Sequence, residues 1–235
     1  MKYLTYSFES KTSLGVLINE EEVINLNKAS KGIIPNCMID FLKNFESNHL
    51  WVKKNINQLN YNGIKLENII LHSPIPRPSS LRDAYAFRQH VEAGRKSRGL
   101  EMIPEYDLFP VFYYSNHNAV SGPGVIYIQK EQSIKLDYEL EIAAVIGKKG
   151  ININVDEADD YIAGFTIMND LSARSLQKEE MKLSLGPAKG KDFLTTLGPF
   201  LVSKDYLKKF CISSTNGDRY DLDMKAFLNG KLLSK

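Results

Sequence analysis

One segment, residues 136–146, constrains the fold of this chain more than any other. Its sequence LDYELEIAAVI begins with alternating acidic and apolar residues, and the two-residue period of a strand places Asp137, Glu139 and Glu141 on one face. Beyond Glu141 the residues of both faces are apolar, which is typical of a buried strand. A solvated face is the alternative for the acidic half, but the apolar half favours a sheet in which Glu139 and Glu141 lie at the rim of a buried face.

Two carboxylates at such a rim would repel each other unless a cation neutralises them. The simplest solution is a hard divalent cation held by oxygen ligands. Asp170 is a third candidate ligand because it follows the apolar strand predicted at residues 161–168. The same position also suits the N-cap of the next helix, so both roles stay open for Asp170.

A predicted helix at residues 83–95 carries two more polar candidates. Asp83 opens it, and His90 lies about two helical turns later, on the same face as Phe87. Helix capping by Asp83 and a packed or surface position for His90 are the structural alternatives. The spacing alone therefore does not identify a site.

A glycine-containing turn, residues 185–192, carries Lys189 and Lys191. Its sequence LGPAKGKD departs from the phosphate-loop pattern, because its glycines are too close together and Asp192 stands where Ser or Thr is required. An NTPase is therefore not indicated. The two lysines suit contact with a carboxylate or an enolate, and a solvated surface loop is the alternative.

The composition excludes several functional classes. Of 235 residues, 43% are hydrophobic and 25% are charged, which is typical of a globular domain. Thirty basic and twenty-eight acidic side chains leave a net charge of +2, too balanced for a nucleic-acid-binding protein. Cys37 and Cys211 are too few for a disulfide framework or a zinc site, and no stretch is typical of a signal peptide or a membrane span. We expect a soluble cytoplasmic protein with no nucleic-acid or membrane partner.

The order of predicted elements divides the chain into a small N-terminal α+β domain, residues 1–70, and a strand-rich domain, residues 71–235. Pro74, Pro76 and Pro78 predict an extended connector at residues 71–80. Alternation and helical spacing predict the other elements. They are strands at 2–9, 14–18, 23–26, 111–114, 125–128, 136–146, 161–168 and 200–202, and helices at 38–45, 83–95 and 172–181.

The C-terminus carries a hairpin signal. Asn229 and Gly230 readily adopt the positive φ angles of a type I′ turn, and they follow alternating residues at 221–228. The residues after Gly230 are expected to be too few to pair with the strand before them. We therefore expect the sequence to be a fragment that lacks the C-terminal part of its catalytic domain.

Taken in order along the chain, these motifs resemble the fumarylacetoacetate hydrolase (FAH) family over about residues 70–205. The motifs are Arg82-Asp83, Arg88-Gln89-His90, Asp137-Tyr138-Glu139-Leu140-Glu141, Asn169-Asp170-Leu171-Ser172-Ala173-Arg174, Gln177 and the segment from Leu185 to Phe193. The resemblance implies an α+β, mostly β fold, in which an FAH-type mixed β-roll or sandwich forms the catalytic domain beside the small N-terminal domain. It also implies a homodimer and a Mg²⁺ cofactor, with Mn²⁺ or Ca²⁺ as alternatives.

Carried over position by position, the resemblance implies a role for each site residue. The metal ligands would be Asp83, Glu139, Glu141 and Asp170. The general base that activates water would be His90, while Lys191 and Thr195 would lie behind the ligands or at the oxyanion. The substrate would be contacted by Tyr85, Tyr113, Arg174 and Gln177, and the catalytic set would comprise His90, Arg174, Gln177 and Lys191.

The sequence departs from the family pattern at a few positions. Ser175 stands where Asp is usual, and Met181 stands where the eukaryotic fumarylacetoacetate enzymes place a tyrosine. Glu92 follows His90 by two residues rather than three and points away from it around a helix. The carboxylate partner of His90 is therefore not identified.

We expect a divalent-metal-dependent hydrolase that cleaves a carbon–carbon bond in a β-diketo acid, a fumarylacetoacetate- or acylpyruvate-like substrate. Water activated by His90 and a metal-stabilised enolate would carry the reaction. A decarboxylase, isomerase or dehydratase of a 2-oxo acid would use the same metal site. A catalytically silent binding module is the non-enzyme alternative, and the loss of His90 or of a metal-binding acid that would mark it is not seen. The sequence leaves the exact substrate, the reaction and the native metal open.

Overall fold

The N-terminal part is built on antiparallel strands whose alternating residues follow the predicted pattern. The computed structural model describes all residues except 59, 60 and 216. The strands are β1 (Lys2–Phe8), β2 (Lys11–Ile18) and β3 (Glu22–Asn25), with the short β4 (Ile64–Lys65) and β5 (Ile70–Leu71) paired to β3 and β1. The helical elements are α1 (Leu26–Ala29), α2 (Met38–Lys43), α3 (Phe45–Asn55), η1 (Ile56–Gln58) and η2 (Leu66–Asn68).

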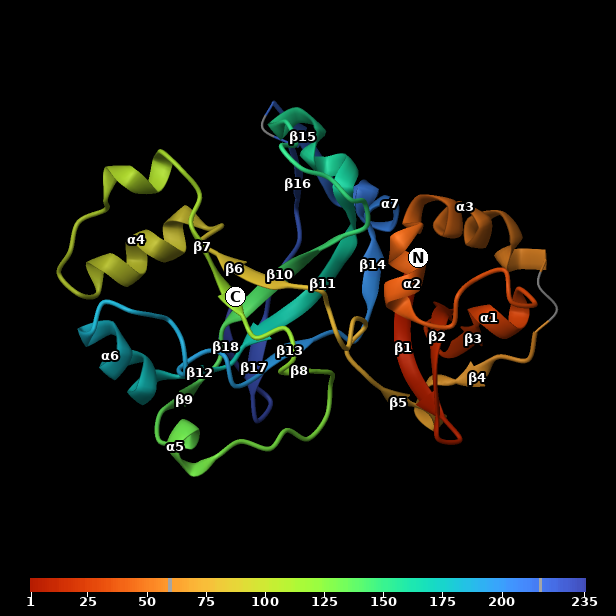
Figure 1. Cartoon of the computed structure of the whole chain (residues 1–235), viewed down its shortest axis with the longest axis horizontal. Helices are drawn as coiled ribbons and strands as arrows, with labels where there is room; N and C mark the ends of the chain where they lie inside the picture. Colours follow the sequence, from red (N-terminus) through yellow and green to blue (C-terminus); the bar gives the residue numbers. More distant parts are fainter. Residues whose placement is uncertain (59–60, 216) are drawn as a thin grey trace.

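The same sheet continues into the second part of the chain (Figure 1). β1 pairs with β14 (Leu201–Ser203), and β14 and β13 (Thr195–Leu197) both pair with β11 (Ile162–Asp170). β10 (Leu140–Ile146) pairs antiparallel with β11, and β8 (Val120–Ser121) pairs parallel with β13. The result is a mixed sheet of 10 strands, so the predicted α+β, mostly β fold is confirmed. Of the connector predicted at residues 71–80, Leu71 ends β5 and residues 72–80 lie in irregular backbone, and the division into two domains stays a prediction.

The remaining elements surround this sheet. The strand pairs are β6 (Leu81–Ala84) with β7 (Phe112–Ser115), β9 (Leu136–Asp137) with β12 (Ser172–Ala173), β15 (Cys211–Ser214) with β16 (Gly217–Tyr220), and β17 (Ala226–Leu228) with β18 (Lys231–Ser234). The helices and 3₁₀ turns are α4 (Arg88–Lys96), η3 (Pro104–Asp107), α5 (Lys130–Ser133), η4 (Val155–Tyr161), α6 (Arg174–Lys182), α7 (Lys204–Leu207) and η5 (Lys208–Phe210).

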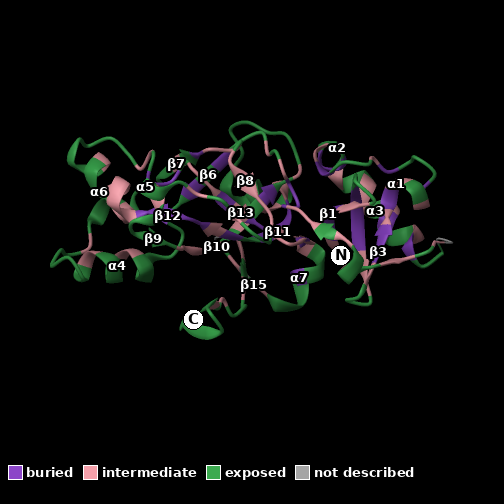
Figure 2. Ribbon diagram, turned by 90° about the horizontal axis from the view of Figure 1, so that it is seen from below, coloured by how far each residue is buried: buried purple, intermediate pink, exposed green. Residues whose placement is uncertain are grey.

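The main hydrophobic core lies between β1 to β3 and the helices α2 and α3. Tyr3 and Phe41 are fully buried, with ring centroids 4.8 Å apart, and Leu14, Val16 and Leu26 pack around them. Burying a side chain of this size contributes about 1.5–3 kcal/mol. Figure 2 shows buried residues gathered in these strands and in the centre of the sheet, whereas α4 is exposed.

Two predicted strands differ from the structure. Residues 125–128 form no strand, because they pair with no strand among the described residues and Val125 and Tyr127 are exposed. The segment 136–146 is divided into β9 and β10, which pair with different partners. The prediction that β10 is buried on both faces is wrong for its outer face, where Ile142 is 40% and Ile146 59% exposed.

The C-terminal hairpin forms as predicted at its turn, since Asn229 and Gly230 both have positive φ angles, 50° and 79°. The prediction that the returning residues cannot pair is wrong. Phe227 lies opposite Leu232 and Leu228 opposite Lys231 in a short antiparallel ladder. A tight two-residue turn brings the strands into register at once, so only a few residues are needed. None of the helices in the described part of the chain is both long and apolar enough to cross a membrane.

Candidate metal centre

Four carboxylates from three segments of the chain converge at the end of β11. Each of Asp83, Glu139, Glu141 and Asp170 offers an oxygen atom, and these atoms all lie within 4.8 Å of one another. The sheet explains three of these positions, because Glu141 lies opposite Met168 and the Asp170 N–H donates to the Glu139 carbonyl at 3.2 Å. The structure thus brings together all four predicted ligands, and their role as ligands stays a prediction.

Asp83 reaches the cluster from a strand and not from a helix. In β6 it lies opposite Tyr113 of β7, and the helix predicted from residue 83 begins only at Arg88. The predicted helical face shared by Asp83, Phe87 and His90 is therefore wrong. Pairing with β7 holds Asp83 in extended backbone and turns its side chain inward, where the residue is 8% exposed.

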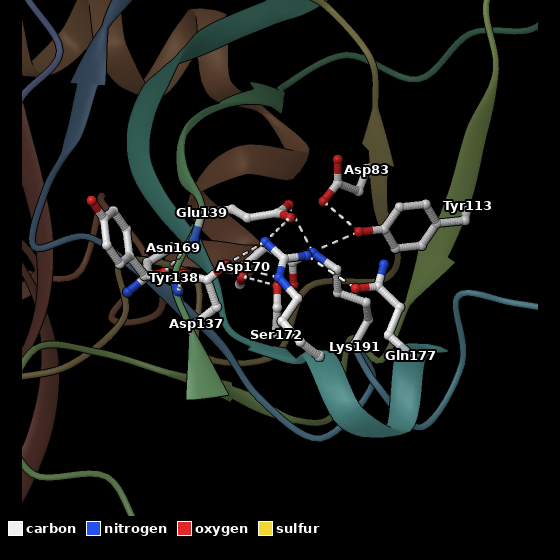
Figure 3. Close-up of polar contacts among 11 residues, drawn as sticks. Asp83, Tyr113, Asp137, Tyr138, Glu139, Asn169, Asp170, Ser172, Gln177 and Lys191 are labelled. Carbon is white, nitrogen blue, oxygen red and sulfur yellow. Dashed lines mark hydrogen bonds and ion pairs between the residues drawn. The ribbon is translucent and has the colours of Figure 1, made fainter. Parts of the chain in front are cut away.

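Asp170 is the most buried member of the cluster. It ends β11 and is fully buried, while α6 begins only at Arg174 because Ser172 and Ala173 form β12. The alternative in which Asp170 caps a helix is therefore wrong. Its Oδ2 atom instead lies 2.6 Å from the Tyr113 hydroxyl and 2.7 Å from Lys191 Nζ (Figure 3).

Tyr113 and Lys191 link the acids to one another. The Tyr113 hydroxyl is within hydrogen-bond distance of both Asp83 (2.8 Å) and Asp170 (2.6 Å). Lys191 is only 3% exposed, and its Nζ lies 2.7 Å from both Glu139 Oε2 and Asp170 Oδ2. The ammonium group is therefore held in one position on the buried side of the acidic cluster.

The four acids of the cluster outnumber the basic side chains beside them, Lys191 and Arg174, and their pKa values reflect this. Burial, reinforced by the charges of Asp83 and Asp170, raises the pKa of Glu141 to about 9. Burial and Asp170 also raise the pKa of Asp83 to about 6, although the Tyr113 hydroxyl opposes this. For Glu139 burial acts in the same direction, but Lys191 and Arg174 outweigh it and hold the pKa of that carboxyl below its usual range.

The donor set fits a hard divalent cation. Carboxylate oxygens are the ligands that Mg²⁺, Mn²⁺ and Ca²⁺ prefer. Asp170 Oδ1 is buried and makes no hydrogen bond with any residue that the structure describes. An orphaned carboxylate oxygen of this kind is costly unless another partner satisfies it. Asp170 Oδ1 is therefore a free ligand position inside the cluster.

Arg174 lies at the more open side of the cluster. Its guanidinium pairs with Asp137 Oδ2 and with Glu139 Oε1, both at 2.8 Å, and donates to Gln177 Oε1 at 3.0 Å. Its side chain remains 30% exposed. Arg174 and Gln177, both predicted substrate contacts, thus lie together beside the four acids.

The remaining predicted residues include two exposed side chains and one that is buried beside Asp170. His90 and Tyr85 are exposed, and the His90 side chain makes no hydrogen bond or ion pair with a described residue. Glu92 pairs with Arg88, so His90 gains no carboxylate partner from it. Thr195 is buried at the start of β13, opposite Asp170 in the sheet.

Two contacts were not anticipated from the sequence. Tyr113 was expected to touch substrate, yet it bridges two of the acids, and Asp137 pairs with Arg174. The alternation of β7 is a signal for the first, because Tyr113 and Ser115 face inward while Phe112 and Tyr114 are exposed. No local pattern connects Asp137 to Arg174.

Comparison with known proteins agrees with this arrangement. The family model described as fumarylacetoacetate (FAA) hydrolase C-terminal matches residues 80–235, more than half of the chain. The chain is 31% identical to oxaloacetate tautomerase YisK of Bacillus subtilis over 225 residues, 89% of this chain and 72% of that protein. It is also 31% identical to the fumarylacetoacetate hydrolase domain-containing protein 2 homolog of Dictyostelium discoideum, over 98% of this chain and 72% of that protein.

A solved structure shows the same fold at lower identity. The maleylpyruvate hydrolase from Sphingobium sp. SYK-6, in complex with manganese(II) ion and pyruvate, has a TM-score of 0.61 and 18% identity. The match covers 87% of this chain and 68% of that chain. Together with the family model and the curated relatives, the likeness leads to one conclusion. The chain belongs to the fumarylacetoacetate hydrolase family, whose members are enzymes that include hydrolases, isomerases and tautomerases.

Proposed function

We propose that this protein is a metal-dependent enzyme that tautomerises a small 2-oxo acid of the oxaloacetate type between its keto and enol forms. The observation that carries the proposal is the convergence of four carboxylates on one point beside a buried lysine and a half-buried arginine. The name of its Bacillus subtilis relative, an oxaloacetate tautomerase, supports this choice of reaction. Mg²⁺ or Mn²⁺ is the proposed ion, with Ca²⁺ as the alternative, and a homodimer stays a prediction.

The residues of the site suit enolisation. A divalent cation held by the four acids would draw electrons from the oxygens of the keto acid, so that water could take the proton from the neighbouring carbon and return a proton to the enolate oxygen. Lys191, held at 2.7 Å from Asp170 and Glu139, keeps a positive charge where negative charge develops. Arg174 reaches solvent with a planar fork that suits a carboxylate of the substrate, and Gln177 orients it by accepting from Nη1.

Hydrolysis of a carbon–carbon bond in a β-diketo acid is the second candidate. Hydrolysis requires a base that activates water. The presence of His90 on α4, the first helix after the strand that carries Asp83, favours this function. Because the His90 side chain is exposed and contacts none of the four acids, tautomerisation, which does not require this base, is preferred.

Turnover of both substrate classes would test the proposal. The protein is treated with EDTA, reloaded with Mn²⁺, and given enol-oxaloacetate in an assay that consumes the keto form with malate dehydrogenase, and an acylpyruvate in parallel. We expect Mn²⁺-dependent tautomerisation that falls about 100-fold in Glu141→Gln. The control Glu157→Gln changes an exposed acid of η4 and should keep the full rate.

Two outcomes would contradict the proposal. If the EDTA-treated protein is as fast as the Mn²⁺-loaded protein, the metal has no part in the reaction. If only the acylpyruvate is consumed, and this depends on His90, the hydrolase is the correct function.

A further inference from the structure

A carboxylate outside the acidic cluster organises the loop before Lys191. Glu180 on α6 accepts hydrogen bonds from three consecutive backbone N–H groups, those of Ala188 (3.3 Å), Lys189 (2.6 Å) and Gly190 (3.1 Å). Successive N–H groups that point at one anion form a concave anion-binding arrangement, and such charge-assisted bonds are stronger than neutral ones. The chain thus supplies its own anion to this loop.

Two further contacts fasten the same loop to α6. The Ala173 N–H donates to the Gly190 carbonyl at 2.8 Å, just before the helix begins. A Cβ at Gly190 would meet the Cα, Cβ and backbone N of Gln177 at 2.8 Å, so only glycine allows this approach. The loop therefore lies directly on the helical turn that carries Arg174 and Gln177.

The residue that follows this loop is Lys191. Its own N–H donates to the Ala188 carbonyl at 2.8 Å, which turns the backbone inward at that point. Its ammonium group then reaches Glu139 and Asp170, both at 2.7 Å, in a site where the residue is 3% exposed. The direction of the Lys191 side chain depends on the three residues that Glu180 holds.

We propose that Glu180 is a positioning residue, which fixes the loop at residues 188–190 so that Lys191 stands at the metal centre. The functional part of this inference rests on the proposed function. Glu180 contacts none of the four acids, so it acts through Lys191 and not on the substrate. Glu179, the preceding residue on α6, bonds only Lys182 among the residues that the structure describes, at 2.8 and 2.9 Å, and is a matched control.

Hydrogen exchange tests the clamp, that is, the hold of Glu180 on the backbone of residues 188–190. In Glu180→Ala we expect the amides of residues 188–190 to exchange at least about tenfold faster than in the wild type, while Glu179→Ala leaves them unchanged. Glu180→Gln, which retains an acceptor oxygen, should restore part of the protection. Unchanged exchange in Glu180→Ala would overturn the clamp.

A double-mutant cycle tests whether the clamp acts through Lys191. We expect Glu180→Ala to lower kcat about tenfold with little change in KM, and to have less than about a twofold effect in the Lys191→Met background. Equal effects in both backgrounds would overturn the positioning role. If the wild type turns over no keto acid, the proposed function fails. The same double-mutant cycle can then be measured with Mn²⁺ affinity in place of kcat. Additive effects of the two substitutions on that affinity would again overturn the positioning role.

Discussion

The two parts of this sheet bury opposite kinds of side chains. Around β1 to β3 the interior is apolar, with Tyr3, Leu14 and Phe41 all fully buried. At the end of β11 the interior is charged, with Asp170 fully buried and Lys191 nearly so. The first region is stabilised by removing apolar surface from water, whereas the second concentrates like charges that favour an added cation. The difference separates the part that stabilises the fold from the part that we propose binds a cation.

Removing a large core side chain should have the largest effect. Phe41→Ala leaves a cavity between Tyr3 and Phe45 and should lower the free energy of unfolding by about 3–5 kcal/mol, measured by urea denaturation. Saturating Mn²⁺ should not change the difference between variant and wild type. Ile33→Ala is the control, since Ile33 is exposed and its truncation should cost less than about 0.5 kcal/mol. Similar losses in both variants would show that the apolar core is not the main support.

Removing the buried ammonium group of Lys191 should lower the free energy of unfolding by less than Phe41→Ala does, and added Mn²⁺ should offset much of this loss. Lys191→Met leaves Asp170 and Glu139 without their ammonium partner, so the metal-free protein should lose about 3 kcal/mol of unfolding free energy. Mn²⁺ at about 100 times its dissociation constant stabilises a binding protein by about 2.7 kcal/mol and should recover much of this loss. If Mn²⁺ does not raise the unfolding free energy of Lys191→Met, the charged interior does not respond to a cation.

The smallest effect is expected where the two regions meet. Asp205 of α7 bonds Lys53 and lies 3.2 Å from His49, both on α3. Burial raises its pKa, but the bonds from Lys53, Ser203 and His49 outweigh this and hold the pKa well below its usual range. Asp205→Asn should cost about 1 kcal/mol at pH 7, a value reduced for solvent screening of a partly exposed pair.

The pH dependence of that cost follows from the depressed pKa. An acid with a lowered folded pKa stabilises the protein above its unfolded pKa of about 3.9, and this stabilisation is lost as the pH falls through the folded value. The difference between wild type and Asp205→Asn should therefore be full at pH 7 and shrink below about pH 4. Asp40→Asn, which removes an exposed pair with Lys43, is the control and should show a much smaller change in the same direction, because solvent screens that pair. A difference that stays full at pH 2 would contradict the assignment.

The sequence predicted those elements whose local residue pattern agrees with their position in the folded sheet. The alternation of residues 2–9 and the apolar run at residues 161–168 predicted β1 and β11, and the Asn229-Gly230 pair predicted the hairpin turn. It failed where tertiary pairing overrides a local pattern. Asp83 resembles a helix start but is held in a strand that pairs with Tyr113, and the apolar residues 125–128 pair with no strand among the described residues.

The candidate site shows the same limit. The local pattern made Glu139, Glu141 and Asp170 candidate ligands, whereas motif order and resemblance added Asp83, because no local rule connects Asp83 to Asp170. The pairing of Asp137 with Arg174 and the hold of Glu180 on the loop depend on how α6 lies against β9 and residues 188–190. Such contacts between distant segments have no periodic signal in the sequence.

A Mn²⁺ titration of the purified, EDTA-treated chain, followed by electron paramagnetic resonance, tests the central statement that Asp83, Glu139, Glu141 and Asp170 form one cation site. We expect saturation at one ion per chain and at least about tenfold weaker binding in Glu141→Gln, with Glu157→Gln unchanged. Absence of saturable binding in the wild type, or equal affinity in Glu141→Gln, would contradict it.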